Sequence, residues 1–158
     1  MPTPHVSVEG FDTQTPTGCM RMNAERTQET SLLTGCERCW PESAEAAWKA
    51  RSDLRERAMW IYESHFNVRG LECQHCTRRF VSVFTENIDW AHGDDTQNWM
   101  MAPVTVSEYR RLEALLASSI EAALRVVPAA RRSLCRHHPS GDDARTFWTT
   151  GIDIGLQD

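Results

Sequence analysis

The sequence lacks any run of apolar residues long enough to span a bilayer. Its first thirty residues also lack a basic segment followed by an apolar one, which is the pattern of a secretory signal. Tyrosine is scarce, so the aromatic content rests on six tryptophans and five phenylalanines. A hydrophobic content of 41% in 158 residues is nevertheless enough to build a core. We therefore expect a soluble, cytoplasmic protein with one domain, or one domain and a tail.

An excess of positive charge is also absent, because the formal net charge is −5. A net acidic domain does not attract phosphate backbones as a whole, which argues against general nucleic-acid binding. Local arginine clusters remain, and most such clusters are simply solvated faces. A basic patch that contacts nucleic acid stays open as an alternative. The clusters are Arg51, Arg55 and Arg57; Arg78 and Arg79; Arg110 and Arg111; and Arg131 and Arg132.

The histidines show no fixed spacing such as His-x-x-x-His on a helix. A catalytic metal site is therefore an alternative that rests on composition alone. Mixed histidine and aspartate ligands would leave an open coordination position for water. The residues available for such a site are His65, His75, His92, His137 and His138 with Asp94, Asp95, Asp142 and Asp143.

Two CxxC pairs give the strongest signal in the chain. Cys36 and Cys39 form the first pair, Cys73 and Cys76 form the second, and 33 residues lie between the pairs. The two-residue spacing lets a tight turn aim both sulfurs at one point, and four thiolates in this pattern suit one tetrahedral zinc ion. A closed four-sulfur site has no open position for substrate, so we expect a structural ion.

Two other interpretations of the cysteines stay open. A rubredoxin-type iron centre uses the same four ligands, although rubredoxin pairs usually end in glycine, and here Trp40 and Thr77 follow the pairs. A redox dithiol at Cys36 and Cys39 is the second, because a helix N-terminus activates thiolates. The segment before Cys36 is too short and polar to be the buried strand that precedes such a dithiol in thioredoxin-like chains. The remaining cysteines, Cys19 and Cys135, are solitary.

The composition divides the chain into a flexible N-terminal arm, residues 1–32, and a zinc-stabilised α+β domain, residues 33–158. The arm is rich in proline and threonine and has no sustained apolar period. In the domain, hydrophobic spacing predicts a helix from Pro41 to about Ala58 that begins at the first cysteine pair. A long amphipathic helix is predicted from Ser107, as its N-cap, to Pro128. The remaining predictions are strands at 66–71, 80–85 and 146–154, a loop over 87–106 and a short helix over 128–135.

The segment from Leu71 to Phe84 resembles zinc-ribbon and zinc-knuckle proteins, in which a β-hairpin carries one CxxC pair and a second pair completes the site. The stretch Phe84-Thr-Glu-Asn-Ile-Asp-Trp90 adds a similarity to small bacterial proteins that follow such a knuckle with the same pattern. The resemblance covers the two pairs and about fifteen residues around the second. It implies a bound zinc ion and no particular reaction. Because the first pair is predicted at the start of a helix and the second on a knuckle hairpin, we expect the ion to clamp the hairpin to the helix.

Three functions follow as hypotheses. The first, which we favour, is a non-catalytic interaction protein, an adaptor or regulator. It would bind a protein partner through the loop from Trp90 to Met101, which we expect to expose tryptophan and methionine beside aspartate. The second is a nucleic-acid-binding ribbon, and the third is a metal-dependent hydrolase or CxxC redox enzyme. No catalytic residue, membrane contact or small-molecule substrate is assigned. The predicted partner-binding residues are Trp90, Asp94, Asp95, Trp99, Arg78 and Arg79.

Overall fold

The structure, a computed structural model, describes residues 35–91, 93 and 95–154. It has one antiparallel sheet of six strands in the order β1-β2-β3-β4-β5-β6, so every strand pairs with the next one in the chain. The predicted α+β class is confirmed, whereas the predicted arm over 1–32 lies outside the described residues. The described part has no helix long and apolar enough to cross a membrane. The strands are β1 (Leu54–Tyr62), β2 (Phe66–Cys73), β3 (Arg79–Asn87), β4 (Thr96–Val104), β5 (Arg132–His138) and β6 (Arg145–Thr150).

Helices cover parts of both faces of the sheet. Side chains alternate along a strand, so neighbouring residues of β3 point to opposite faces. Val81 and Val83 pack on one face with α3 (Val106–Leu116) and α4 (Ile120–Leu124). Phe80 packs on the other face with Trp40 and with α2 (Ala44–Ala50), which continues into the 3-10 turn η1 (Arg51–Asp53). We call these the α3–α4 face and the α2 face.

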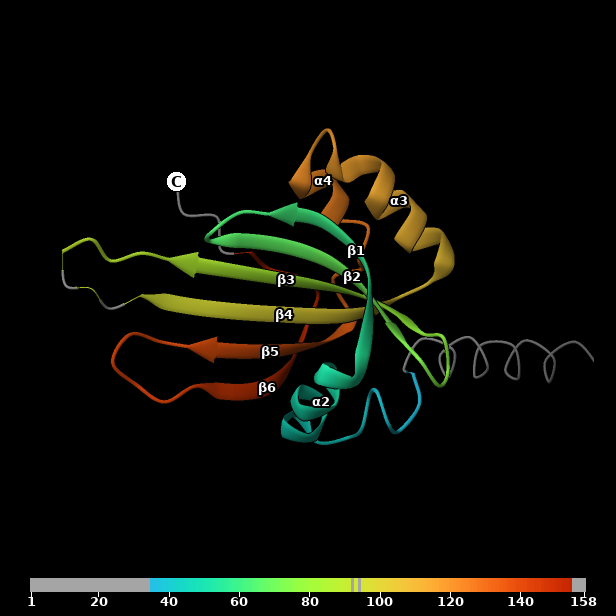
Figure 1. The fold of residues 1–158 in the computed structure, drawn as a ribbon, viewed down its shortest axis with the longest axis horizontal. Helices are drawn as coiled ribbons and strands as arrows, with labels where there is room; N and C mark the ends of the chain where they lie inside the picture. Colours follow the sequence, from blue (N-terminus) through green and yellow to red (C-terminus); the bar gives the residue numbers. More distant parts are fainter. Residues whose placement is uncertain (1–34, 92, 94, 155–158) are drawn as a thin grey trace, which may run out of the picture.

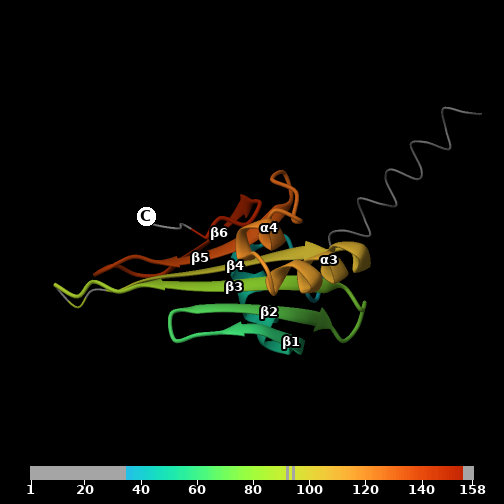
Figure 2. The ribbon, with the colours of Figure 1, turned by 90° about the horizontal axis from the view of Figure 1, so that it is seen from above.

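The two ends of the sheet differ. The cysteine end carries the β2–β3 turn and the α3–α4 connection between β4 and β5. The tip end carries the other three hairpin turns, residues 63–65, 88–95 and 139–144. Figure 1 shows that the three helices gather toward the cysteine end, while the β3–β4 hairpin extends furthest in the opposite direction. Figure 2, turned by 90°, shows the same extension. The tip half of the sheet is therefore left without a covering helix.

The first predicted helix is wrong in its second half. The α-helix ends at Ala50, and β1 takes up the segment from Leu54 that the sequence assigns to the helix. Strand β1 is an edge strand with two register shifts against β2, at Glu56/Ala58 and Met59/Ile61. Edge strands tolerate charge and bulges, so the alternation that marks a strand is broken here. The helix N-cap is Ser43, which places the first cysteine pair in a separate turn before the helix.

Three strands were expected, and the structure contains all of them. Strands β2 and β3 include the predicted ranges 66–71 and 80–85, and β6 covers the first part of 146–154. Two other predictions are wrong. The segment over 87–106 contains β4, a central strand, and the segment over 128–135 enters β5 where a short helix was expected.

The long helix is present but interrupted. It divides into α3 and α4, because Ser119 caps a new helix through a hydrogen bond from the Ala122 backbone N–H at 3.2 Å. The N-cap of α3 is Thr105 and not Ser107. Thr105 and Glu108 form a reciprocal capping box, which satisfies two backbone N–H groups at the start of the helix.

Glu108 also joins α3 to the sheet through Arg131. The Arg131 guanidinium donates to both Glu108 carboxylate oxygens, at 2.9 and 3.2 Å, and to the Pro103 carbonyl at 2.7 Å. Both side chains are mostly buried, with 11% of Arg131 and 16% of Glu108 exposed. Burial would by itself raise the pKa of Glu108, but the hydrogen bonds from Arg131 and the Thr105 N–H outweigh it and lower the pKa below its usual value.

We predict that Arg131→Met lowers the free energy of unfolding by about 2–4 kcal/mol at neutral pH, because it leaves the mostly buried Glu108 carboxylate without its ion-pair partner. Urea unfolding of both proteins at a series of pH values measures this difference. Because the pKa of Glu108 is lowered in the folded protein, its ionised carboxylate stabilises the fold at neutral pH. This stabilisation is lost as the pH falls through the folded-state pKa of Glu108. The difference between the two proteins should therefore shrink below pH ~4.

Arg110→Met is the matched control, because Arg110 lies on the exposed side of α3. It should change the free energy of unfolding by less than about 0.5 kcal/mol. A loss for Arg131→Met that stays constant down to the acid transition would contradict the role given to Glu108.

Candidate metal centre

Two short turns bring the four cysteines of the CxxC pairs together. In the first turn, the Cys36 carbonyl accepts hydrogen bonds from the backbone N–H groups of Cys39 and Trp40, at 3.1 and 2.8 Å. In the second, the Cys73 carbonyl accepts from the Thr77 N–H at 2.9 Å. Each turn is therefore closed by a bond from the residue after the second cysteine to the carbonyl of the first. This shared geometry directs both sulfurs of a pair to the same side.

The second turn sits at the end of the β2–β3 hairpin. The Cys73 N–H donates to the Arg78 carbonyl at 2.8 Å and closes the hairpin. Thr77 has a φ of 57°, the left-handed conformation that glycine adopts most easily. Its hydroxyl donates to the Cys76 carbonyl at 2.7 Å. Thr77 thus adopts the conformation that glycine would take at this position.

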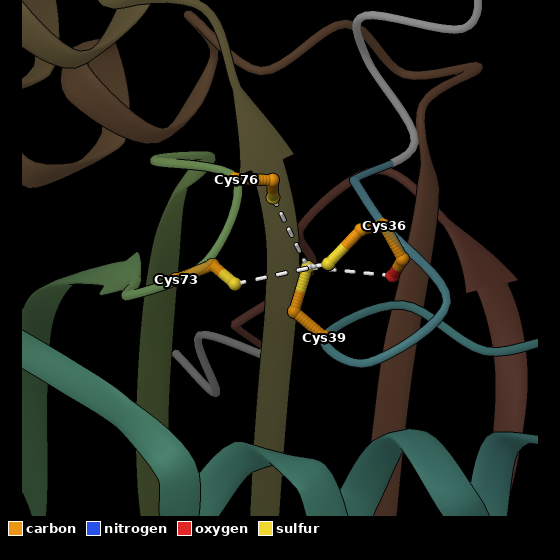
Figure 3. Close-up of side chains that lie close together, drawn as sticks. All are labelled: Cys36, Cys39, Cys73 and Cys76. Atoms are coloured by element: carbon orange, nitrogen blue, oxygen red, sulfur yellow. Dashed lines mark hydrogen bonds between the residues drawn. The ribbon is translucent and has the colours of Figure 1, made fainter.

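The four sulfurs form a compact cluster (Figure 3). The Sγ–Sγ distances are 3.6 Å for Cys36–Cys39, 3.9 Å for Cys36–Cys73 and 3.6 Å for Cys39–Cys76, and all four atoms lie within 4.8 Å of one another. A tetrahedron with Zn–S bonds near 2.3 Å has edges of about 3.8 Å. These distances are much longer than the ~2.05 Å of a disulfide bond. The donor set and its spacing fit a tetrahedral metal ion.

The surroundings shift the pKa values of the cysteine thiols in different directions. Burial tends to raise the pKa of Cys36, but hydrogen bonds from the backbone N–H groups of Cys39 and Arg38 outweigh it and lower the pKa to about 7. Burial raises the pKa of Cys39 well above its usual value, and it also raises that of Cys76. Cys39 and Cys73 are each 2% exposed. A bound dication would offset the cost of ionising these buried thiols, since a metal ion deprotonates its thiol ligands.

Aromatic packing holds the first turn against the sheet. The Trp40 ring lies 5.3 Å from the Phe80 ring and 4.7 Å from the Trp148 ring, between centroids. The Arg132 guanidinium lies 3.8 Å from the centroid of the Trp148 ring on the outer side. The Trp148 indole N–H donates to the Glu42 carbonyl at 2.6 Å. These contacts connect the turn before α2 to the strands β3 and β6 on the α2 face.

Gly35 is a site residue that sequence analysis did not identify. Its φ is +76°, and a Cβ placed on it would lie 2.9 Å from the Cys39 sulfur. A side chain at this position would therefore press against a ligand sulfur. The signal was the glycine directly before the first CxxC pair, where the chain must turn.

The other predicted site residues lie apart from the sulfurs. Among residues 35–154, with 92 and 94 left out, the cysteines are the one group of three or more potential ligands that could hold an ion. His75 is exposed beside the Arg38 guanidinium, at 3.2 Å, as expected for a knuckle histidine that faces solvent. His65 hydrogen-bonds to Glu86 at 2.9 Å. His92 and Asp94 fall outside the described residues.

The five predicted partner-binding residues that the structure describes are scattered. Trp90 is 89% exposed at the tip end. The Trp99 ring packs against Phe84 and Trp48, at 4.7 and 5.8 Å between centroids. The Arg79 guanidinium lies 3.5 Å from the Glu72 carboxylate and 4.7 Å from the centroid of the Tyr109 ring. The remaining described ones, Asp95 and Arg78, lie in the β3–β4 turn and beside the second cysteine turn.

Comparisons of the chain with protein-family models, with curated proteins and with solved structures found no match.

We predict that the purified protein binds one zinc ion per chain and that Cys73→Ser removes it. Loss of a buried thiolate ligand should lower the melting temperature and broaden the transition, because a structural zinc site contributes on the order of 10 kcal/mol to folding. Metal content by mass spectrometry and thermal melting by circular dichroism measure both effects. Iron in place of zinc would identify a rubredoxin-type centre.

Cys135→Ser is the matched control, because Cys135 is a buried cysteine outside the cluster. It should leave the metal content at one ion per chain. Retention of the full metal content by Cys73→Ser would show that this sulfur is not a ligand.

Proposed function

We propose that the protein is a zinc-stabilised, non-catalytic binding protein that recognises a protein partner through the tip of the β3–β4 hairpin. The observation that carries the proposal is the 89% exposure of the Trp90 side chain at this tip. Burial of a tryptophan in an interface contributes about 4–6 kcal/mol of hydrophobic free energy before the costs of association. Tryptophan is also among the residues most often found to dominate binding energy at interfaces.

Hydrogen bonds within the turn hold Trp90 in place. The Asp89 carboxylate accepts from the Ala91 N–H at 2.9 Å, and the Asp89 carbonyl accepts from the Gly93 N–H at 2.8 Å. The Asp95 carboxylate accepts from the Asp89 N–H at 3.1 Å and joins the two sides of the turn. Backbone restrained in this way at Asp89 and Ala91, on either side of Trp90, loses less conformational entropy on binding than a flexible segment does. It thus supports a role for Trp90 as a pre-positioned contact.

The acidic residues of this hairpin suggest the charge of the partner. Asp89 and Asp95 lie beside Trp90, and the whole chain carries a net charge of −5. We therefore propose that the partner has a basic surface around an apolar pocket, since complementary charge steers association. Nucleic acid is the less favoured alternative, because the Arg79 guanidinium already pairs with Glu72 and packs on Tyr109.

The position of the cysteines supports a structural role for the zinc. They lie at the cysteine end, and the Trp90 turn lies at the opposite end of β3. The ion would fasten the turn before α2 to the β2–β3 hairpin and so hold the sheet that carries the tip. A redox role for Cys36 and Cys39 would need these thiols free of metal.

We predict that Trp90→Ala greatly reduces capture of the protein partner while leaving the fold unchanged. Tagged wild type and variant are used to isolate partners from the native host, and captured proteins are compared by quantitative mass spectrometry. Loss of one hot-spot tryptophan weakens binding by about 2–4 kcal/mol, which is at least tenfold. Melting temperature and zinc content should stay at the wild-type values.

Val106→Ala is the matched control, because Val106 is 52% exposed at the cysteine end. It should capture the same proteins as the wild type. Equal capture by wild type and Trp90→Ala would overturn the assignment of the binding surface. Binding of a mixed-sequence oligonucleotide that collapses with added salt would instead favour the nucleic-acid alternative.

A further inference from the structure

A groove lies on the tip half of the α3–α4 face, where no helix covers the sheet. We call it the tip groove, and its volume is about 670 Å³. Cavities of 300–1,000 Å³ are the usual size for small-molecule sites. Its floor consists of side chains that alternate along β3, β4, β5 and β6 and so point to the same face. They include Thr85, Asn98, Met100, Cys135, His137 and Phe147.

The C-terminal end of the described chain forms one wall of the groove. After β6 the chain turns at Gly151, whose φ is +69° and whose N–H donates to the Arg131 carbonyl at 2.7 Å. The Asp153 N–H then donates to the Met100 sulfur at 3.3 Å. Ile154 packs against the core beneath α3 and α4 and lines the same groove. The residues after β6 therefore bound the groove on one side.

The apolar part of the lining includes an aromatic ring that the fold does not cover. Phe147 is 44% exposed, although it lies on a strand with a well-packed opposite face. Met100 is 5% exposed and lies on the floor two strands away, because Cys135 pairs with Met100 on one side and with Phe147 on the other. A flat ring and a thioether together offer a surface that suits the face of another ring. This points to a ligand with an apolar ring.

The polar part of the lining offers hydrogen bonds without net charge. The Cys135 thiol donates to Asn98 Oδ1 at 3.2 Å, which leaves the Asn98 amide N–H₂ group as its donor toward the groove. Asn98 pairs with His137 across β4 and β5, so an amide and an imidazole lie side by side. Thr85 and Thr149 add hydroxyl groups. These groups suit hydroxyl or carbonyl oxygens on a ligand.

The charged groups of the groove disfavour an ionic ligand. No lysine or arginine of the described chain lines it, so a carboxylate or phosphate would have no counter-charge. The Glu86 carboxylate already accepts hydrogen bonds from Gln97 at 2.6 Å and from His65 at 2.9 Å. A cationic ligand would have to compete with both for Glu86, and Asp153, the other carboxylate of the lining, also already makes an interaction within the chain. An uncharged ligand avoids both costs.

Cys135 does not make the groove a nucleophilic site. Burial raises the pKa of its thiol to about 11, so it stays protonated at neutral pH. Its hydrogen bond goes to Asn98 and not to His137, two residues further along the same strand. The thiol thus positions the Asn98 amide, and the groove binds without a covalent step.

We propose that the tip groove binds an uncharged small molecule with an apolar ring and hydroxyl or carbonyl groups. The ring lies against Phe147 and Met100, and its oxygen accepts from the Asn98 amide. This site is separate from the Trp90 contact, because it lies on a sheet face and not on the hairpin tip. It goes beyond the proposed protein recognition and does not depend on it.

The test uses the full zinc-loaded chain with ¹³C-labelled methionine methyl groups. Met100 faces the groove, while Met101, its neighbour on β4, is 2% exposed within the core of the α2 face. The probes are benzyl alcohol, benzoate and benzylamine, which share one ring and differ in charge. We expect benzyl alcohol to shift the Met100 methyl signal saturably at millimolar concentrations, with the Met101 signal unchanged. Benzoate and benzylamine should bind at least several-fold more weakly.

Phe147→Ala is the matched variant, because Phe147 is 44% exposed and its ring lies outside the packed core. It should weaken benzyl alcohol binding on the order of tenfold while the Met101 signal stays at its wild-type position. The proposal is overturned if Met100 shows no saturable shift or if both methionines shift alike. It is equally overturned if Phe147→Ala binds as the wild type does. Tighter binding of benzoate or benzylamine would overturn the uncharged class of ligand.

Discussion

The convergence of four sulfurs at one point is the constraint on which the rest of the fold depends. Ionised thiols held within 4.8 Å repel one another, and neutral thiols at this spacing form only weak hydrogen bonds. A cation at the centre makes the arrangement favourable, because every thiolate then contacts a charge of opposite sign. The turn at Cys36–Cys39 contributes few backbone hydrogen bonds of its own. Its attachment to the sheet therefore rests on the contacts of Trp40 and on the hydrogen bonds to the Glu42 carbonyl, and a bound ion would add to them.

The cysteine cluster could be predicted from the sequence because its geometry is encoded locally. Each CxxC pair specifies a turn, and that turn appears in both places. Strand β3 was equally readable from its run of β-branched and aromatic residues. Pairing between the two turns required only the chemistry of the sulfurs. The contact between the two CxxC turns was thus predictable, since both turns offer thiolates that suit the same metal ion.

The wrong predictions have a common physical cause. In each case the local sequence allowed more than one structure, and contacts with other parts of the chain determined which one formed. Strand β4 begins among Asp, Thr, Gln and Asn, so its start resembles a loop, and Pro103 breaks the pattern at its other end. As a central strand it is paired on both sides, and that pairing is invisible in its own residues. The capping box of α3 is visible in the sequence as Thr105 with Glu108, whereas the prediction places the N-cap at Ser107. Trp99 looked like a surface residue because its partners, Phe84 and Trp48, come from other elements.

The order of strands in the sheet has a consequence for how the protein reaches its fold. A meander forms from hairpins whose contacts are close in sequence, which favours rapid pairing. The β2–β3 hairpin brings Cys73 and Cys76 together by itself, before any distant contact is made. The first pair must close a loop that includes α2, β1 and β2, which costs more entropy. We therefore expect the hairpin thiols to capture the metal first and the turn at Cys36–Cys39 to complete the coordination last, so that folding of the region before β1 follows the supply of zinc.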